Sequence, residues 1–532
     1  MMVSSRLPRL CAMLLLLGLS PARAQDSLTL RVIPFPAVPL AARFERIEAL
    51  ETRMAGAPTT LPPFEIEADS SVPSLRLAAA FAPEADRGFR LALLPRESRA
   101  IAYALADWTR TGARTLLEKR LRAAIVSAYA ARDFAPFWNE RNASARESLA
   151  RRLHAAGEDG LDLRGFAPPA AVDSSRALSP AEEFAFDESI LTYVSQASGS
   201  RVDPSTISHL IGARPQTPDL SKALARLAAA GGGAGDELEA CNPPHYGYRL
   251  LREKLADLRG RRISRGSDAI VEARDSLDDA VPTRRARPQP SEGATSALEA
   301  EIIANMERWR WLPRDLGEDR VEVNLPEFEL AVVRGGSVVH RTRIIVGKPE
   351  TPTPIFSNAI RFVIVNPAWN VPESIITKEM LPKAGGDLSG LAERGWKVRS
   401  VHGKLMVQQP PGAGNALGQL KIMFPNDFSV YMHDTPSRGL FAATRRAFSH
   451  GCMRVQNPFS LAEAILGSEG GYSEARLRSM IGDKERYVYL KTPLPVHIEY
   501  FTAFVDESGR LRQLEDLYGY SAKVRQALGL GG

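Results

Sequence analysis

Two stretches near the C-terminus decide the expected fold: Ser429-Val430-Tyr431-Met432-His433-Asp434-Thr435 and Ser449-His450-Gly451-Cys452-Met453-Arg454. The first, with Val and Tyr among apolar neighbours, predicts a β-strand that ends at His433. Gly451 allows the backbone to approach closely beside Cys452. A cysteine attacks as its thiolate, and a nearby imidazole can remove the thiol proton. The two stretches therefore predict a strand end that carries a reactive cysteine, while a tight loop without chemistry explains the second stretch equally well.

Further strands are predicted around these two stretches, which makes the C-terminal third mainly β. Their residues are β-branched or aromatic, and Gly335-Gly336 turns one run into the next as a hairpin. The expected strands are 321–324, 327–333, 338–346, 360–365, 404–408, 420–423, 429–433 and 487–491. Between about 373 and 403, the run Lys378-Glu379-Met380-Leu381 and several glycines favour a small helical insertion. We expect this insertion to form a cap.

Helical spacing of apolar residues dominates the chain before the strands, so the predicted fold class is α+β. We expect a helical domain at 116–260, a polar linker at 261–296 and the β-rich domain at 297–500, with a short helix in the tail 501–532. The Ala- and Pro-rich segment 25–115 is predicted to be partly disordered, apart from a short helix near 40–54.

The first 24 residues have the layout of a cleavable secretory signal. Arg6 and Arg9 precede an apolar run at 10–19, and Ala22-Arg23-Ala24 provides the small residues of a cleavage site. An apolar run of this length is too short to cross a bilayer, which needs about 20 residues. We therefore expect export to the periplasm, and no transmembrane segment after the signal is cleaved.

Charge and cysteine content narrow the classes of function. The chain has 68 basic and 62 acidic residues, dispersed along the sequence, so a nucleic-acid partner is not expected. Removal of the signal leaves Cys241 and Cys452, and a disulfide between them remains the less favoured alternative. A metal site at His433, Asp434, His450 and Cys452 is also disfavoured, because no paired ligand spacing is present. No cofactor is expected.

The motif of His433 followed by Ser449-His450-Gly451-Cys452-Met453-Arg454 resembles the signature of L,D-transpeptidase catalytic domains of the YkuD type. The likeness to the large periplasmic YcbB-type branch extends over roughly 298–500, and a weaker one reaches the helical domain, which resembles that branch's scaffold domain. The motifs that carry it include Val346-Gly347-Lys348-Pro349, Asn366-Pro367-Ala368-Trp369-Asn370, Pro411-Gly412-Ala413-Gly414-Asn415 and Phe134-Ala135-Pro136-Phe137-Trp138. The polar segment 261–296 is too short for the separate peptidoglycan-binding module of many relatives.

The resemblance assigns roles to particular residues. It implies that Cys452 is the attacking thiolate and His433 its general base, with a backbone carbonyl of 449–451 orienting the imidazole, so that Asp434 is not required. It further implies a supporting loop and oxyanion site at Ser449, His450, Gly451, Met453 and Arg454, and a substrate groove lined by Tyr431 and Met432. Arg454 has two interpretations, holding the loop or contacting a substrate carboxylate.

The implied reaction joins peptidoglycan tetrapeptide stems. Cys452 is expected to attack the L-centre carbonyl of meso-diaminopimelate, release D-Ala and pass the acyl group to a second stem as a 3→3 cross-link. Attachment of an outer-membrane protein, or transfer to water, would use the same intermediate. A wall-binding scaffold without catalysis is the alternative of a different class, and the helical domain could contact other cell-wall enzymes.

Overall fold

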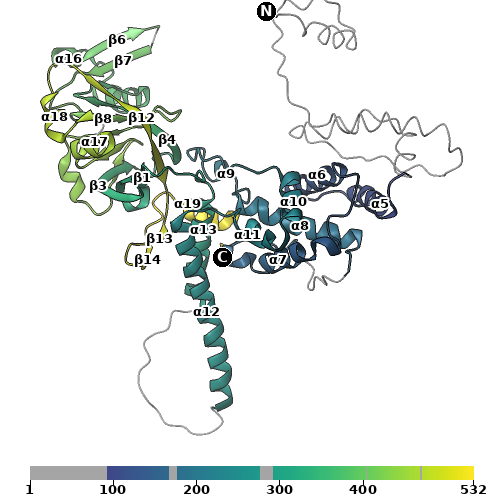
Figure 1. The fold of residues 1–532 in the computed structure, drawn as a ribbon. Helices are drawn as coiled ribbons and strands as arrows, with labels where there is room; N and C mark the ends of the chain where they lie inside the picture. The colour runs from purple at the N-terminus through teal and green to yellow at the C-terminus, as the bar shows by residue number, and fades with distance from the viewer. Residues whose placement is uncertain (1–92, 167–175, 276–291, 403, 468–469, 532) are drawn as a thin grey trace, which may run out of the picture. The chain divides into compact units, whose positions relative to one another are not determined.

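The computed structural model describes residues 93–531 except 167–175, 276–291, 403 and 468–469 (Figure 1). The predicted signal 1–24 and the predicted helix at 40–54 lie outside the described residues. The chain divides into two units, Met1–Arg99 and Ala100–Gly532, and the fold that follows is that of the second. None of the helices in the described part of the chain combines the length and apolar character needed to cross a membrane.

A group of helices forms the first part of this unit, as its apolar spacing predicted. They are α5 Arg96–Arg110, α6 Leu116–Ala130, α7 Ala143–His154, α8 Pro180–Ala197, α9 Pro204–Ile207, α10 Leu220–Ala229 and α11 Ala234–Glu239. Two of these helices begin at N-cap residues of a favoured type. The Thr115 side chain accepts from the Glu118 amide at the start of α6, and Ser179 forms a capping box with Glu182 at the start of α8. α5 lies in a segment predicted to be partly disordered, and it is ordered because Ile101, Ala102 and Leu105 share a buried face.

Buried carboxylates tie these helices together. The Tyr129 hydroxyl of α6 lies 2.5 Å from Glu183 and 2.8 Å from Asp187, both on α8. The indole of Trp138 donates to Asp187 at 2.7 Å, and the Trp138 amide donates to Glu183 at 3.1 Å. Burial raises the pKa of Asp187, and its hydrogen bonds offset part of the cost of removing it from water.

Helical backbone occupies both ends of the predicted linker at 261–296. α12 runs over Tyr246–Asp275 and α13 over Glu292–Trp309, and 276–291 lies outside the described residues. The polar composition predicted a linker, but the Arg, Glu and Ala residues of 261–275 are good helix formers and allow α12 to continue.

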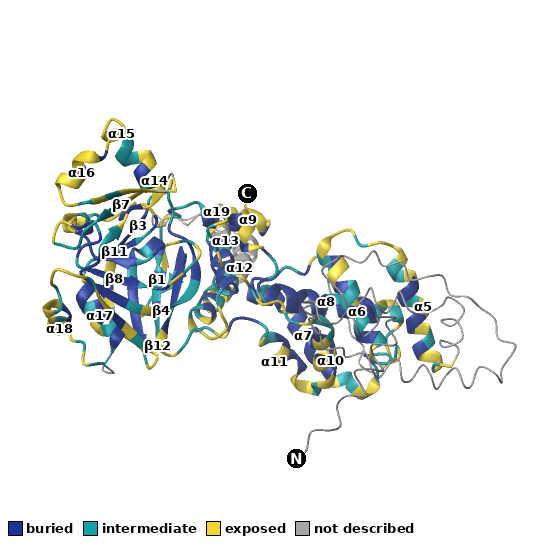
Figure 2. Cartoon of the chain, turned by 90° about the horizontal axis from the view of Figure 1, so that it is seen from above, coloured by how far each residue is buried: buried dark blue, intermediate teal, exposed yellow. Residues whose placement is uncertain are grey.

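The β-rich part is a sheet with strand order β10-β3-β11-β9-β8-β4-β12-β1-β2, which an additional pairing of β3 with β2 closes on itself. β1 and β12, β9 and β11, and β3 and β10 pair in parallel. The strands are β1 Arg320–Asn324, β2 Glu329–Arg334, β3 Ser337–Gly347, β4 Phe356–Val365, β8 Leu420–Met423, β9 Met432–His433, β10 Ala447–Ser449, β11 Met453–Val455 and β12 Arg486–Glu499. α17 Pro458–Leu466 packs on its buried side, and α18 Glu474–Ser479 lies against α17. Figure 2 shows these strands largely in the colour of buried residues.

The cap follows β4 and has a small hydrophobic cluster of its own, formed by Val371, Ile376, Leu388, Leu391 and Val407. It was predicted to be helical over 373–403, and this holds only for about its first two-thirds, as far as Glu393. The cap consists of β5 Trp369–Asn370, α14 Glu373–Ile375, the π-helical turn Ile376–Met380, α15 Leu381–Lys383, α16 Ser389–Glu393, β6 Lys397–Val401 and β7 Lys404–Gln409. β-branched residues in β6 and β7 favour the hairpin over a helix.

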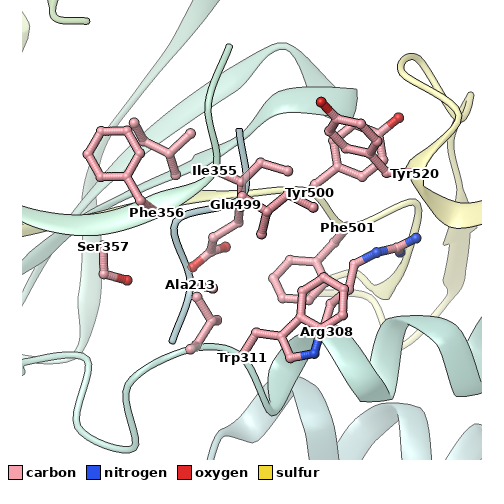
Figure 3. A pocket seen from close by; sticks show the side chains of 13 residues that line it. Ala213, Arg308, Trp311, Ile355, Phe356, Ser357, Glu499, Tyr500, Phe501 and Tyr520 are labelled. Carbon is pink, nitrogen blue, oxygen red and sulfur yellow. The ribbon is translucent and has the colours of Figure 1, made fainter. Parts of the chain in front are cut away.

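The C-terminal tail, residues 501–531, packs against the helical part of the chain. It forms the hairpin β13 Ala503–Val505 with β14 Leu511–Gln513, then α19 Tyr520–Ala527, which packs against α13. A short parallel bridge joins Ile211 to Ile355, with the Gly212 amide 2.8 Å from the Ile355 carbonyl. Figure 3 shows a cavity at this junction, which Trp311, Arg308, Ile355 and neighbouring side chains line. Its volume of about 20 Å³ admits a water molecule and excludes a substrate.

Candidate active site

The two stretches that decide the fold become neighbouring parallel strands. β9 pairs with β11, so that Met432 lies opposite Met453 and His433 lies opposite Arg454. The Met453 amide also donates to the carbonyl of Tyr431 at 3.1 Å. This pairing unites residues that are far apart in the sequence.

Cys452 extends this register by one residue, which sets it opposite Tyr431. A hydrogen bond between the Tyr431 hydroxyl and the sulfur of Cys452 accompanies that placement. Because side chains alternate between the two faces of a sheet, Cys452 shares one face with Tyr431, His433 and Arg454. The predicted nucleophile and base therefore lie on the same sheet face, on adjacent strands.

The same alternation contradicts the predicted position of Met432. Its side chain and that of Met453 are fully buried and belong to the hydrophobic core. They point to the opposite face of the sheet from Cys452. Met432 therefore does not line a substrate groove, and Met453 anchors the end of the loop by packing in the core. Tyr431 remains on the site face, where its ring lies 5.7 Å from that of His433.

His433 is oriented by a backbone carbonyl, although not by the one expected. Its Nδ1 lies 2.5 Å from the carbonyl oxygen of Asp434, and the ring also hydrogen-bonds the backbone of Leu417, so neither of these partners belongs to 449–451. A carbonyl can only accept, so Nδ1 carries the proton and Nε2 is the basic nitrogen of the neutral ring. Burial lowers the pKa of His433 to about 3, and the charges of Arg454 and Lys421 add to this effect.

The carboxylate of Asp434 has a structural role. It is buried and accepts from the Gln419 amide at 2.9 Å, from the Thr435 amide at 2.7 Å and from the Arg438 guanidinium at 2.7 Å. A Cβ on Gly418 would collide with this side chain. Asp434 thus fixes the chain that follows β9, and its carboxylate does not orient the imidazole.

Two cations face the thiol. Burial raises the pKa of Cys452, whereas hydrogen bonds from Tyr431 and the charges of Lys421 and Arg454 oppose that rise. Lys421 lies directly opposite His433 in the sheet, and its Nζ is 3.8 Å from the centre of the Tyr431 ring. Lys421 was not predicted as a site residue, although it is the single charged residue in the otherwise apolar strand Leu420–Met423.

Hydrogen bonds from the Ser449 side chain and from Thr351 and Thr353, which follow β3, hold the loop before Cys452. The Ser449 hydroxyl donates to the Cys452 carbonyl at 2.5 Å and accepts from the Gly451 amide at 3.1 Å. Thr353 donates to the Gly451 carbonyl at 2.8 Å, and Thr351 donates to the Ser449 carbonyl at 3.2 Å. Gly451 has a φ of 116°, which is strained for any residue with a side chain.

Residues 318–494 match the YkuD family, described as the L,D-transpeptidase catalytic domain, and residues 123–255 match the family described as a scaffold domain. The β-rich part of the chain is an L,D-transpeptidase catalytic domain. The α+β fold, with a helical scaffold domain ahead of it, is as predicted.

A curated protein of Haemophilus influenzae named "Putative L,D-transpeptidase" is 31% identical over 249 residues. The matched region covers 44% of this chain, and the chain spans about half of that relative's length. An L,D-transpeptidase from Mycobacterium smegmatis is 14% identical over 34% of this chain and 58% of its own, with a TM-score of 0.20. The catalytic domain of an Enterococcus faecium L,D-transpeptidase, acylated by ertapenem, is 17% identical over 35% of this chain and 98% of its own, with a TM-score of 0.16.

The cap contacts the L,D-transpeptidase domain at two points near Cys452. Nε2 of His450 lies 2.6 Å from the Glu379 carboxylate of the cap. Trp369, at the base of the cap, hydrogen-bonds with Tyr431. His450 was predicted to shape the loop, and the structure gives it a partner outside the loop. Glu379 was not predicted as a site residue, because nothing in the sequence relates it to residue 450.

Arg454 lies two residues after Cys452, on the same face of the L,D-transpeptidase domain. Burial lowers its pKa, and the nearby Cys452 opposes that effect. Its two interpretations, loop support and recognition of a carboxylate, both stay predictions.

Cys241 and Cys452 are each free thiols, so the alternative of a disulfide between them is wrong for this structure. Among the described residues, no group of three or more His, Cys, Asp or Glu side chains is arranged to hold a metal ion.

Proposed function

We propose that the chain is a peptidoglycan L,D-transpeptidase that forms 3→3 cross-links through a thioester on Cys452. The observation that supports this most directly is the register of β9 and β11. It places Cys452 and His433 on one face of a domain that matches L,D-transpeptidases. The buried imidazole is neutral, and its Nδ1 is engaged by the Asp434 carbonyl, so Nε2 is the basic atom on that face.

In the first half-reaction, His433 Nε2 takes the proton of the Cys452 thiol as sulfur attacks the L-centre carbonyl of diaminopimelate in a tetrapeptide stem. A C–S bond forms and the carbonyl becomes an oxyanion. His433 then gives its proton to the leaving amine, the C–N bond breaks, and D-Ala departs. A thioester of the remaining tripeptide stays on Cys452, which divides one amide substitution into two easier steps.

The oxyanion donor proposed here is the amide of Cys452. The Gly451 amide is bonded to the Ser449 hydroxyl and the Met453 amide to the Tyr431 carbonyl. Neither of them is therefore placed to serve the substrate, whereas the amide of the nucleophile's own residue lies next to the carbon that is attacked.

In the second half-reaction, the side-chain amine of a second stem's diaminopimelate attacks the thioester. His433 accepts a proton from that amine, a C–N bond forms, the C–S bond breaks and the thiolate is reprotonated. The cap, held to the loop by His450 and Glu379 and to the strand by Trp369, would restrict water and so favour the amine.

The proposed setting is the periplasm, where the substrate lies, reached through the signal sequence predicted at 1–24. In that setting the scaffold domain would contact other cell-wall enzymes. Two acceptors other than a second stem use the same thioester: a protein amine, which would attach an outer-membrane protein to the wall, and water.

The test is turnover of tetrapeptide-bearing muropeptides by purified protein that lacks 1–24. We expect free D-Ala together with 3→3 dimers, both abolished in Cys452→Ala and both retained in Cys241→Ala, the matched control on the other free thiol. Tripeptide monomers alone would identify water as the acceptor. Tight binding to peptidoglycan without turnover would replace the enzyme by a wall-binding scaffold.

A further inference from the structure

Three aromatic side chains form an exposed cluster on the catalytic domain. Phe362 of β4 lies with its ring 5.9 Å from that of Tyr487 and 5.2 Å from that of Tyr489, both on β12. The two tyrosine rings are 6.4 Å apart and nearly parallel, at 20°. Tyr487 is 49% exposed and Tyr489 68%, although aromatic residues in a sheet usually contribute to its core. We call these three residues the aromatic platform.

The platform lies in register with the nucleophile. Tyr489 pairs with Phe362, and Phe362 pairs with Met423 of β8. The antiparallel pairing of β8 with β9 puts Met423 across from Tyr431, which the register of β9 and β11 sets opposite Cys452. One row of residues, perpendicular to the strands, therefore runs from Tyr489 to Cys452.

All members of this row point to the same side of the sheet, because residues directly opposite each other share a face. The burial pattern agrees: Val363 and Val488, which alternate with the platform, are in the core together with Ile422. The platform and the thiol thus lie on the same face of the sheet.

The spacing along this row suits a defined ligand. Three strand intervals separate Phe362 from Cys452 and four separate Tyr489 from it, which at about 4.8 Å each gives about 14 Å and 19 Å along the sheet. Between a muramyl sugar and the diaminopimelate carbonyl lie a lactyl group and three amino acids, of which the three residues span at most about 11 Å when extended. The γ-linkage of the glutamate and the lactyl group lengthen this reach, so a stem attacked at Cys452 would set its sugar over the platform.

We propose that the aromatic platform binds the glycan strand of the donor, with an N-acetylhexosamine ring stacked on Tyr487 and Tyr489. This inference rests on the proposed function of Cys452. The C–H face of a pyranose ring is apolar and flat, and it packs on aromatic rings whose hydroxyl groups can bond the sugar's edge. Three rings present far less surface than a protein partner buries, about 800 Å² on each side, but they match one or two sugars.

The test compares two donors with one set of variants. We expect Tyr487→Ala/Tyr489→Ala to lower kcat/KM for a disaccharide tetrapeptide about tenfold, mainly through KM, and to leave a sugar-free tetrapeptide unchanged. Tyr489→Phe, which keeps the ring, should retain most of the activity. Tyr246→Ala is the matched control, because Tyr246 is also 68% exposed and lies on α12.

A binding measurement keeps the inference separate from the proposed reaction. With Cys452→Ser protein, an N-acetylglucosamine tetramer should bind measurably by calorimetry, and the double tyrosine variant should lose that binding. Equal losses for both donors would overturn the platform and indicate a role in peptide binding or folding. The absence of tetramer binding to the Cys452→Ser protein would also overturn it. If no donor releases D-Ala while the tetramer binds at these tyrosines, the platform stands and the proposed reaction fails.

Discussion

Cys452 and Cys241 are both free and partly buried, and burial raises the pKa of each thiol. Cys241 lines a cleft of about 920 Å³ together with His245. A thiol, an imidazole and an open cleft therefore also occur together at Cys241.

The neighbours of the two thiols differ in what they can do. The Cys241 thiol, which follows α11, donates to the Glu237 carbonyl of that helix at 3.7 Å. His245 is engaged through Nε2 with the Pro313 carbonyl at 2.9 Å, and its ring lies against Trp309. Cations oppose the pKa rise of both thiols, Arg226 and Arg314 for Cys241 and Lys421 and Arg454 for Cys452. The Tyr431 hydroxyl, and the imidazole of His433 on the same sheet face, are what distinguish Cys452. Neighbouring groups of this kind, rather than the volume of a cavity, support the choice of Cys452 as the proposed nucleophile.

The largest effect is expected at the base. His433→Gln removes the basic nitrogen from the face of Cys452 and should lower kcat by about 10²–10⁴-fold. The matched substitution His245→Gln should leave kcat within a factor of about two, because that imidazole faces Pro313 and Trp309. Rates of D-Ala release measure both. A comparable loss in the two variants would remove the distinction between the thiols.

Most of the longer strands were predictable from the sequence, but the short strands β10 and β11 that flank Cys452 were not, and neither were the faces of the residues. Alternating and β-branched runs indicated β8 at its observed bounds and β9 by its C-terminal residue, His433. Whether Met432 or its neighbours face the site depends on the register with β11, which no local pattern encodes. The same holds for the pairing of His450 with Glu379. The residue type and spacing around Cys452 therefore indicated the chemistry, whereas Lys421 and the Asp434 carbonyl required the assembled sheet.

A smaller effect is expected from the cation beside the thiol. Lys421→Met removes a charge that opposes the rise of the Cys452 pKa, so the pKa should rise further and the thiolate fraction at pH 8 should fall. Alkylation of Cys452 by iodoacetamide should slow by up to about tenfold, and that of Cys241 should not change. Peptide mapping after timed labelling separates the two sites. Faster alkylation of Cys452 in this variant would contradict the assigned role of Lys421.

The cap contact should contribute less, because His450 and Glu379 are each about one-third exposed, at 34% and 36%. Glu379→Gln should raise the share of hydrolysed tripeptide about two- to fivefold, in line with the 0.2–1 kcal/mol typical of exposed ion pairs. His450→Gln should have the same effect, and the double variant should add nothing further. Fully additive effects would show that the two side chains do not act together.

The smallest effect is expected from pH. An imidazole with an ordinary pKa near 6.5 would lose about sixteenfold in its basic form between pH 6.5 and 5. His433, whose pKa is lowered to about 3, stays neutral over that range. The kcat/KM for D-Ala release should therefore change by less than about twofold between pH 7 and 5 and fall only near pH 3. An acid limb centred near pH 6.5 would contradict the burial of this ring.

The nucleophilic role of Cys452 is tested most directly by locating a covalent adduct. The full mature chain is incubated with a tetrapeptide muropeptide or with a carbapenem, quenched in acid and examined by intact mass and peptide mapping. We predict one acyl group per chain, on Cys452, and none in Cys452→Ala. An adduct on Cys241, or an acyl group that persists in Cys452→Ala, would contradict the assignment.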